Sequence, residues 1–95
     1  MKYMENAEGE MTKLILKKGF VEVRVNISGI FQKVTFKVEK EKSGGIEYTT
    51  LHTDKLVGIS DLAKIAAETG LPAESPTGKV FPKGKSAKDF QNLQV

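Results

Sequence analysis

The clearest pattern in this chain is an alternation of apolar and polar residues in its second quarter. Across 21–27, every second residue is valine or isoleucine, and charged or amide residues stand between them. A second alternation runs across 30–40. A period of two is typical of a β-strand with one buried face. The two segments therefore predict a pair of antiparallel strands joined at Ser28-Gly29.

A two-residue loop at Ser28-Gly29 would fix which residues of the two strands face each other. The expected partners are Ile27 with Ile30, Val25 with Gln32, Val23 with Val34, and Val21 with Phe36. The apolar sides of both strands coincide in this register, as a one-sided core requires. We therefore expect one face of this hairpin to be dry and the other to be wet.

Three further segments complete the predicted domain. The glycine-containing stretch 41–45 predicts a turn, and 46–53 predicts a returning strand whose facing is ambiguous without a bulge. The stretch 13–18 predicts another strand, with a short helix as the alternative. Across 60–69, apolar residues follow one helical face, with Ser60 as the expected N-cap and Gly70 as the expected C-terminal stop.

These segments together predict an α+β fold. It is an antiparallel β-sheet of about four strands in the order β-β-β-β-α, with one helix packed on one face and flexible termini. We assign 13–72 to a single α+β domain. We expect 1–12 to be a flexible N-terminal arm and 73–95 to be a loosely ordered, basic C-terminal tail.

The composition of the 95 residues excludes several classes of protein. Without cysteine there is no disulfide framework, thiol catalysis or cysteine zinc site, and one histidine cannot build a multi-histidine metal centre. There is also no apolar run of transmembrane length and no signal-peptide pattern at the start. We therefore expect a cytoplasmic protein with no cofactor, no metal and no membrane contact.

Neither catalysis nor nucleotide binding has a convincing motif here. Gly84-Lys85-Ser86 lacks the glycine that a P-loop needs five residues earlier, where this chain has Lys79. His52, Asp54 and Ser60 could form a catalytic set only through geometry that sequence does not define. We therefore expect a binding protein rather than an enzyme.

The charge is positive and unevenly distributed. The net charge is +3, from 15 basic and 12 acidic residues, with net values of +4 in 13–58 and +3 in 79–95. Such basic regions point to a polyanionic partner. Fourteen of the fifteen cations are lysine, which favours backbone contact, or simple solubility, over base-specific recognition.

The predicted wet face of the hairpin combines these cations with aromatic rings. Its candidate nucleic-acid-binding residues are Phe20, Arg24, Phe31, Lys33 and Lys37, and Lys79, Lys83 and Lys85 would add a flexible clamp. Rings that stack on bases beside lysines that follow phosphates are typical of single-stranded nucleic-acid platforms. We therefore expect non-specific binding of single-stranded DNA or RNA. In topology alone, four strands and a helix resemble small coactivator-like and Whirly-type single-stranded DNA binders.

Two other interpretations of the same residues stay open. Phe20, Phe31 and the outer strand edge could instead meet another protein chain, which would make this a protein–protein interaction or self-assembly module, such as a homodimer. Alternatively, the two rings pack under the termini and leave ordinary solvated lysines. Exposure of the two rings separates this last interpretation from the others.

Overall fold

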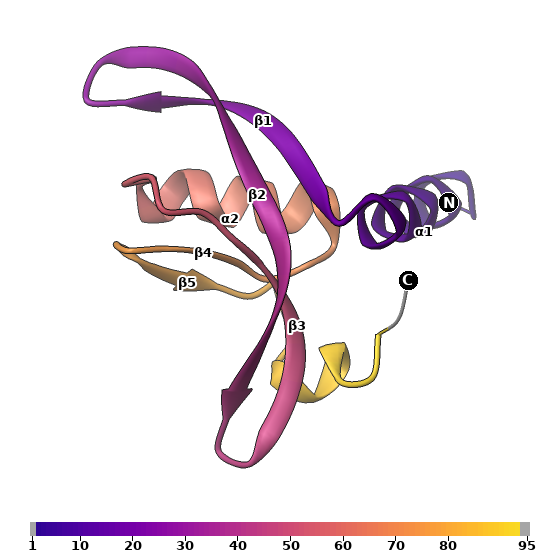
Figure 1. The fold of residues 1–95 in the computed structure, drawn as a ribbon. Helices are drawn as coiled ribbons and strands as arrows, with labels where there is room; N and C mark the ends of the chain where they lie inside the picture. Colours follow the sequence, from indigo (N-terminus) through magenta and orange to yellow (C-terminus); the bar gives the residue numbers. More distant parts are fainter. Residues whose placement is uncertain (1, 94–95) are drawn as a thin grey trace.

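The α+β class is confirmed in outline by a computed structural model, which describes the backbone of residues 2–93 and the side chains of residues 9–93 (Figure 1). The elements in chain order are α1 (Lys2–Lys18), β1 (Phe20–Ile27), β2 (Ile30–Ser43), β3 (Ile46–His52), α2 (Ile59–Thr69), β4 (Ala73–Ser75), β5 (Gly78–Val80) and the 3₁₀ helix η1 (Ala87–Phe90). In these residues the sheet has five strands and is mixed, rather than having about four antiparallel strands.

The predicted hairpin is formed by β1 and β2 in the expected register. Ile27 faces Ile30, Val23 faces Val34 and Val21 faces Phe36. Ser28 and Gly29 have φ values of 55° and 85°, which is the twisted two-residue turn that suits such hairpins. Val25, Val34 and Phe36 are buried, so the dry face is where the alternation predicts it.

The sheet has the strand order β1-β2-β3-β4-β5 and curls around α2 (Figure 1). Only the β3–β4 pairing is parallel among the described strands, and α2 makes the crossover between them. In Figure 1, α2 lies inside the curl, with the β1–β2 hairpin on one side and the β4–β5 hairpin on the other. The fully buried side chains of Phe36, Leu51 and Leu62 fill the space between sheet and helix.

Helix α2 begins two residues earlier than an N-cap at Ser60 would place it. Its N-cap is Gly58, without a side-chain cap hydrogen bond, so Ser60 lies within the first turn. The predicted apolar face is buried, through Leu62, Ile65, Ala66 and Thr69. The helix ends at Gly70, which is left-handed at φ 74° and donates its N–H to the Ala66 carbonyl, as expected.

The predicted strand at 13–18 is wrong, because these residues end helix α1. Ile15 and Leu16 are both buried, and Leu14 is 52% exposed. Two adjacent buried residues suit a helix that packs one stripe, whereas a half-buried strand alternates. Residues 2–12, expected as a flexible arm, form the first part of this helix, and Met1 lies outside the described residues. The observed element order also removes the topological resemblance to the single-stranded DNA binders.

The predicted tail, 73–95, supplies part of the fold as far as it is described. It contributes β4, β5 and η1, and Phe90 of η1 is buried in the core. Gln91 forms an isolated bridge with Tyr48 along the edge of β3 that β4 leaves uncovered. Residues 94–95 lie outside the described residues. Three-residue strands are too short to show alternation, which explains why the sequence did not reveal them.

Strand β3 is buried on both faces, which resolves its ambiguous pattern without a bulge. Tyr48 and Thr50 lie on one face, Thr49 and Leu51 lie on the other, and all four are almost fully buried. Its pairing with β2 is regular from Lys37–His52 to Ser43–Ile46. A central strand of this kind loses the simple apolar–polar alternation because neither side faces water.

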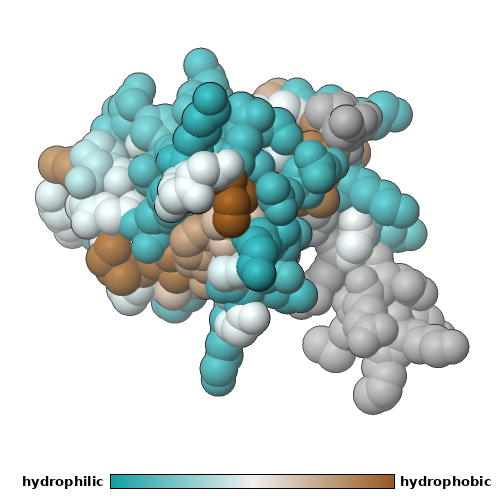
Figure 2. Space-filling model, turned by 90° about the horizontal axis from the view of Figure 1, so that it is seen from below, coloured by the Kyte–Doolittle hydropathy of each residue, from teal (hydrophilic) through white to brown (hydrophobic). Residues whose placement is uncertain are grey.

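The surface is largely hydrophilic on the face seen in Figure 2. Hydrophilic residues cover most of this face, and hydrophobic residues reach the surface in small separate groups (Figure 2). Among the residues that the structure describes, no helix combines the length and hydrophobicity needed to cross a membrane.

Candidate functional site

The outer face of the β1–β2 hairpin carries most of the predicted binding residues. We define this outer face as Phe20, Glu22, Arg24 and Asn26 of β1 with Phe31, Lys33, Thr35 and Lys37 of β2. All eight are exposed, with Phe20 at 42% and Phe31 at 64%. The two rings therefore do not pack beneath other described parts of the chain.

Three cations on this outer face are placed by the strand register. Arg24 lies directly opposite Lys33, and Phe20 lies opposite Lys37. Glu22 is the one acidic residue of the eight, and its carboxylate is 4.0 Å from the Lys33 ammonium, with both side chains about half exposed. The outer face thus has three cations against one carboxylate, a net charge of +2.

The Arg24–Lys33 pair is the most unusual feature of this face. In a hairpin with a two-residue loop, the closing pair exchanges both hydrogen bonds and the pairs then alternate. Ile27–Ile30 is the closing pair, so Arg24–Lys33 is a non-hydrogen-bonded pair, in which side chains approach most closely. Like charges directly opposite each other destabilise a sheet. An anion bound between them would remove that repulsion.

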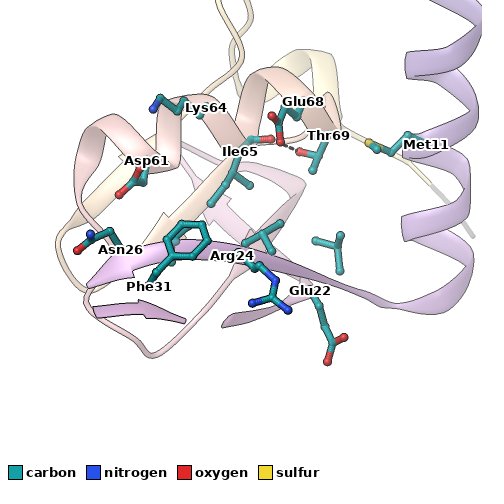
Figure 3. Close-up of a pocket in the computed structure, with 13 residues that line it drawn as sticks. Met11, Glu22, Arg24, Asn26, Phe31, Asp61, Lys64, Ile65, Glu68 and Thr69 are labelled. Atoms are coloured by element: carbon teal, nitrogen blue, oxygen red, sulfur yellow. Dashed lines mark hydrogen bonds between the residues drawn. The ribbon is translucent and has the colours of Figure 1, made fainter. Parts of the chain in front are cut away.

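A groove of about 580 Å³ lies between β1 and α2 (Figure 3). Asn26, Phe31 and Asp61 lie toward one end of it, and Met11 lies at the other (Figure 3). Its charged residues are Glu22, Arg24, Asp61, Lys64 and Glu68. Because these give three carboxylates against two cations, the groove itself is a poor place for phosphate. The outer face, with its net charge of +2, suits an anion better than this groove does.

The three lysines predicted as a clamp do not extend this outer face. Lys79 lies in β5 and forms an ion pair with Glu41 at 2.7 Å, with 24% of each side chain exposed. Lys83 and Lys85 are exposed and line a separate groove of about 490 Å³ beside Thr12 of α1 and Ala67 of α2. Figure 3 shows none of these lysines at the groove that borders the hairpin.

A second polar cluster, which the sequence did not reveal, joins four strands. We define the carboxylate–histidine cluster as Glu41 of β2, His52 of β3, Glu74 of β4 and Lys79 of β5. Ligand atoms of Glu41, His52 and Glu74 lie within 4.8 Å of one another. Lys79 also donates a hydrogen bond to the hydroxyl of Tyr48 and lies over its ring, 5.0 Å from the centroid. The cluster depends on β4 and β5, which sequence patterning missed.

Both ring nitrogens of His52 face carboxylates. Nδ1 is 3.3 Å from Glu74 and Nε2 is 3.2 Å from Asp54. Only the imidazolium form donates from both nitrogens. Partial burial opposes that charge, but the hydrogen bonds to Asp54 and Glu74 outweigh it and raise the pKa of His52. Of the three residues considered as a catalytic set, His52 and Asp54 are therefore in contact, whereas Ser60 is exposed at the start of α2.

The two glutamates of the cluster have pKa values displaced in opposite directions. The hydrogen bond from Glu74, followed by Lys79, lowers the pKa of Glu41 against the effect of burial. Burial, followed by the hydrogen bond to Glu41, raises the pKa of Glu74. Burial acts against the charge of Lys79, but Glu41 and Tyr48 raise its pKa to about 12.

The charged groups within the carboxylate–histidine cluster neutralise one another and leave no favourable place for a metal ion. A glutamate–histidine–glutamate set has the ligand types of a transition-metal site. Here, however, the ammonium of Lys79 is in contact with Glu41, and a cation in that position repels a metal ion. We therefore assign this cluster to the joining of β2, β3, β4 and β5.

The outer face thus brings together two exposed aromatic rings, three cations and one carboxylate. Comparison with known protein families, with curated proteins and with solved structures finds no match to this chain.

Proposed function

We propose that this protein binds single-stranded DNA or RNA, with little sequence preference, through the outer face of the β1–β2 hairpin. The observation that carries the proposal is the close pair of like charges, Arg24 and Lys33, between two exposed phenylalanine rings. A phosphate between the two cations relieves their repulsion, and each ring offers a stacking surface for a base.

The spacing on the outer face suits a short single strand. Phe20 and Asn26 are the end positions of the β1 row, and Phe31 lies opposite Asn26. Six residues of extended strand separate these positions, which corresponds to about 20 Å. A strand crossing this distance would stack at both ends and pass the cations between them. Lys37, opposite Phe20, would contact a phosphate at the second end.

The proposed interface consists of Phe20, Arg24, Phe31, Lys33 and Lys37. Lys79 is left out because its ammonium is already paired with Glu41. Lys83 and Lys85 are left out because they lie beside the helices rather than on the hairpin. The proposed interface therefore has five of the eight residues predicted from the sequence, all of them on the β1–β2 hairpin.

The test is a fluorescence anisotropy titration with a labelled oligonucleotide of mixed sequence, as DNA and as RNA. We expect binding at low salt whose logarithm falls with the logarithm of salt concentration, with a slope of about −0.7 per phosphate contacted. Phe31→Ala should weaken binding by about 1–3 kcal/mol, the usual value of one stacked base. Arg24→Ala and Lys33→Ala should each reduce the magnitude of the salt slope by about 0.7.

Ile30→Ala is the matched control for Phe31→Ala. The two side chains are neighbours with the same 64% exposure, but they project from opposite faces of β2. Ile30→Ala should leave oligonucleotide affinity unchanged, as should Lys85→Ala. The absence of saturable binding at low salt, or an equal loss in Ile30→Ala and Phe31→Ala, would contradict the proposal.

A further inference from the structure

The outer edge of β1 carries a second interaction surface. β1 stands at one end of the strand order, so in the described part of the chain β2 is its only strand neighbour. All six residues 21–26 line the groove beside α2. Because side chains of a strand alternate between its two faces, the groove must run along the free edge of β1. We infer that two copies of this chain pair through β1, antiparallel and about a two-fold axis at Val23.

The direction of the backbone groups restricts how such a pair can form. The Gly19 carbonyl accepts a hydrogen bond from the Val38 N–H, so odd-numbered residues of β1 bond to β2. The N–H and C=O groups of Phe20, Glu22, Arg24 and Asn26 therefore point to the free edge. Two such edges can exchange hydrogen bonds only when even-numbered residues face even-numbered residues.

Charge then selects one register among those that remain. With Val23 on the two-fold axis, Glu22 of each copy faces Arg24 of the other, and Phe20 faces Asn26. A shift that places Glu22 on the axis sets the two Glu22 carboxylates opposite each other. A shift that places Arg24 on the axis sets the two Arg24 guanidinium groups opposite each other. Like charges in opposing positions destabilise a sheet and unlike charges stabilise it.

The selected register also relieves the repulsion within each copy. Arg24 has Lys33 as its neighbour on the β2 side, and no described ion pair involves Arg24. In the dimer, Glu22 of the second copy lies on its other side. Across the joined outer faces, the two neighbouring cations Lys33 and Arg24 would then be followed by the carboxylate of Glu22 from the second copy.

The exposed apolar residues at the two ends of β1 are complementary in this arrangement. Met11, Leu14 and Phe20 gather where β1 begins, and their side chains are 45%, 52% and 42% exposed. Ile30 and Phe31 lie at the hairpin tip and are each 64% exposed. Antiparallel pairing places the tip of each hairpin beside the beginning of β1 in the other copy, so Ile30 of one copy would lie near Met11 and Leu14 of the other.

The dimer would also extend the apolar face of β1 that is turned toward α2. Val21 and Val23 are half-buried on the wall of the groove, where Ile65 of α2 faces them. The same residues of the second copy would continue this apolar row beneath α2. Dimer formation does not depend on nucleic-acid binding, and it would place two proposed oligonucleotide interfaces on one continuous sheet.

The test is the mass in solution, by sedimentation velocity over a wide concentration range, against a chain mass of 10.4 kDa. The unaltered protein should reach twice this mass. Glu22→Arg and Arg24→Glu should each weaken dimerisation by about tenfold or more, because both symmetric contacts become repulsive. The double variant E22R/R24E restores opposite charges in the same register, so it should restore dimerisation to near the original level.

Glu39→Arg is the matched control, because it makes the same change on β2, away from the free edge, where Glu39 faces Thr50. It should leave the mass unchanged. Arg24→Pro provides a second test, since it removes an outward-pointing N–H without removing a β1–β2 hydrogen bond. A strictly monomeric protein, or a dimer that E22R, R24E and R24P leave intact, would overturn the inference.

Discussion

Replacement of Gly70 by alanine tests how tightly α1 and α2 are joined. Gly70 ends α2 in a left-handed conformation, and a Cβ placed on it would lie 2.8 Å from Oγ1 of Thr12 in α1. That hydroxyl donates a hydrogen bond of 2.7 Å to the carbonyl of Thr69. The added methyl group therefore has to displace Thr12 from this contact.

The expected cost has two parts that a second glycine can separate. A left-handed alanine costs about 1–2 kcal/mol, offset by about 0.4–1 kcal/mol because alanine restricts the unfolded chain. Displacing Thr12 adds the loss of one hydrogen bond, about 0.5–1.5 kcal/mol. Gly19, which ends α1 at φ 89°, has no atom within 4 Å of its added Cβ. Gly19→Ala therefore carries only the first part.

Urea unfolding followed by far-ultraviolet circular dichroism measures both variants. We expect Gly70→Ala to be less stable than Gly19→Ala by about 1 kcal/mol, which corresponds to a difference of about 4–8 °C in Tm for a domain of this size. In a Thr12→Ala background, this difference should disappear, as a double-mutant cycle requires. If Gly70→Ala costs no more than Gly19→Ala in the original background, the proposed contact between the helices does not stabilise the fold.

Two further predictions concern the carboxylate–histidine cluster. Because Asp54 and Glu74 raise the pKa of His52 above its ordinary value of 6.5, its stabilising effect should be complete below that value and decline as pH rises through the folded-state pKa. Unfolding free energies of the protein and of His52→Gln between about pH 5 and pH 8 should diverge toward acid; parallel curves would contradict this. Lys79→Met should cost about 2 kcal/mol at neutral pH, because it leaves Glu41 beside Glu74 without its cation. The loss should shrink in acid, where the carboxylates are protonated, and an equal loss at both pH values would refute the electrostatic explanation.

The parts of the fold that the sequence predicted are those with local, regular signals. The register of β1 with β2 follows from a strict alternation and a two-residue loop, and the structure confirms it pair by pair. The buried face of α2 follows from apolar spacing and a terminal glycine. In both cases each residue's environment is fixed by near neighbours in the chain, which periodicity can detect.

The parts that the sequence did not predict depend on distant contacts. Leu14, Ile15 and Leu16 suit either a strand or a helix, and the packing of this segment against α2 and β1 decides between them. The three residues of β4 become a strand because β3 offers an open edge after α2 has turned the chain back. The carboxylate–histidine cluster was missed for the same reason, since Glu41 and Lys79 are brought together by tertiary pairing alone.

The connections between strands have a consequence for how the chain reaches this structure. Among the described residues, three of the four strand pairings join sequence neighbours across two-residue turns, at Ser28-Gly29, Gly44-Gly45 and Pro76-Thr77. Such hairpins close in microseconds. The parallel pairing of Leu51 with Ala73 instead requires a loop of about twenty residues to close. Docking of the β4–β5 hairpin onto the first three strands should therefore be the slow event of folding, and it is the event that completes the cover over the apolar face of α2.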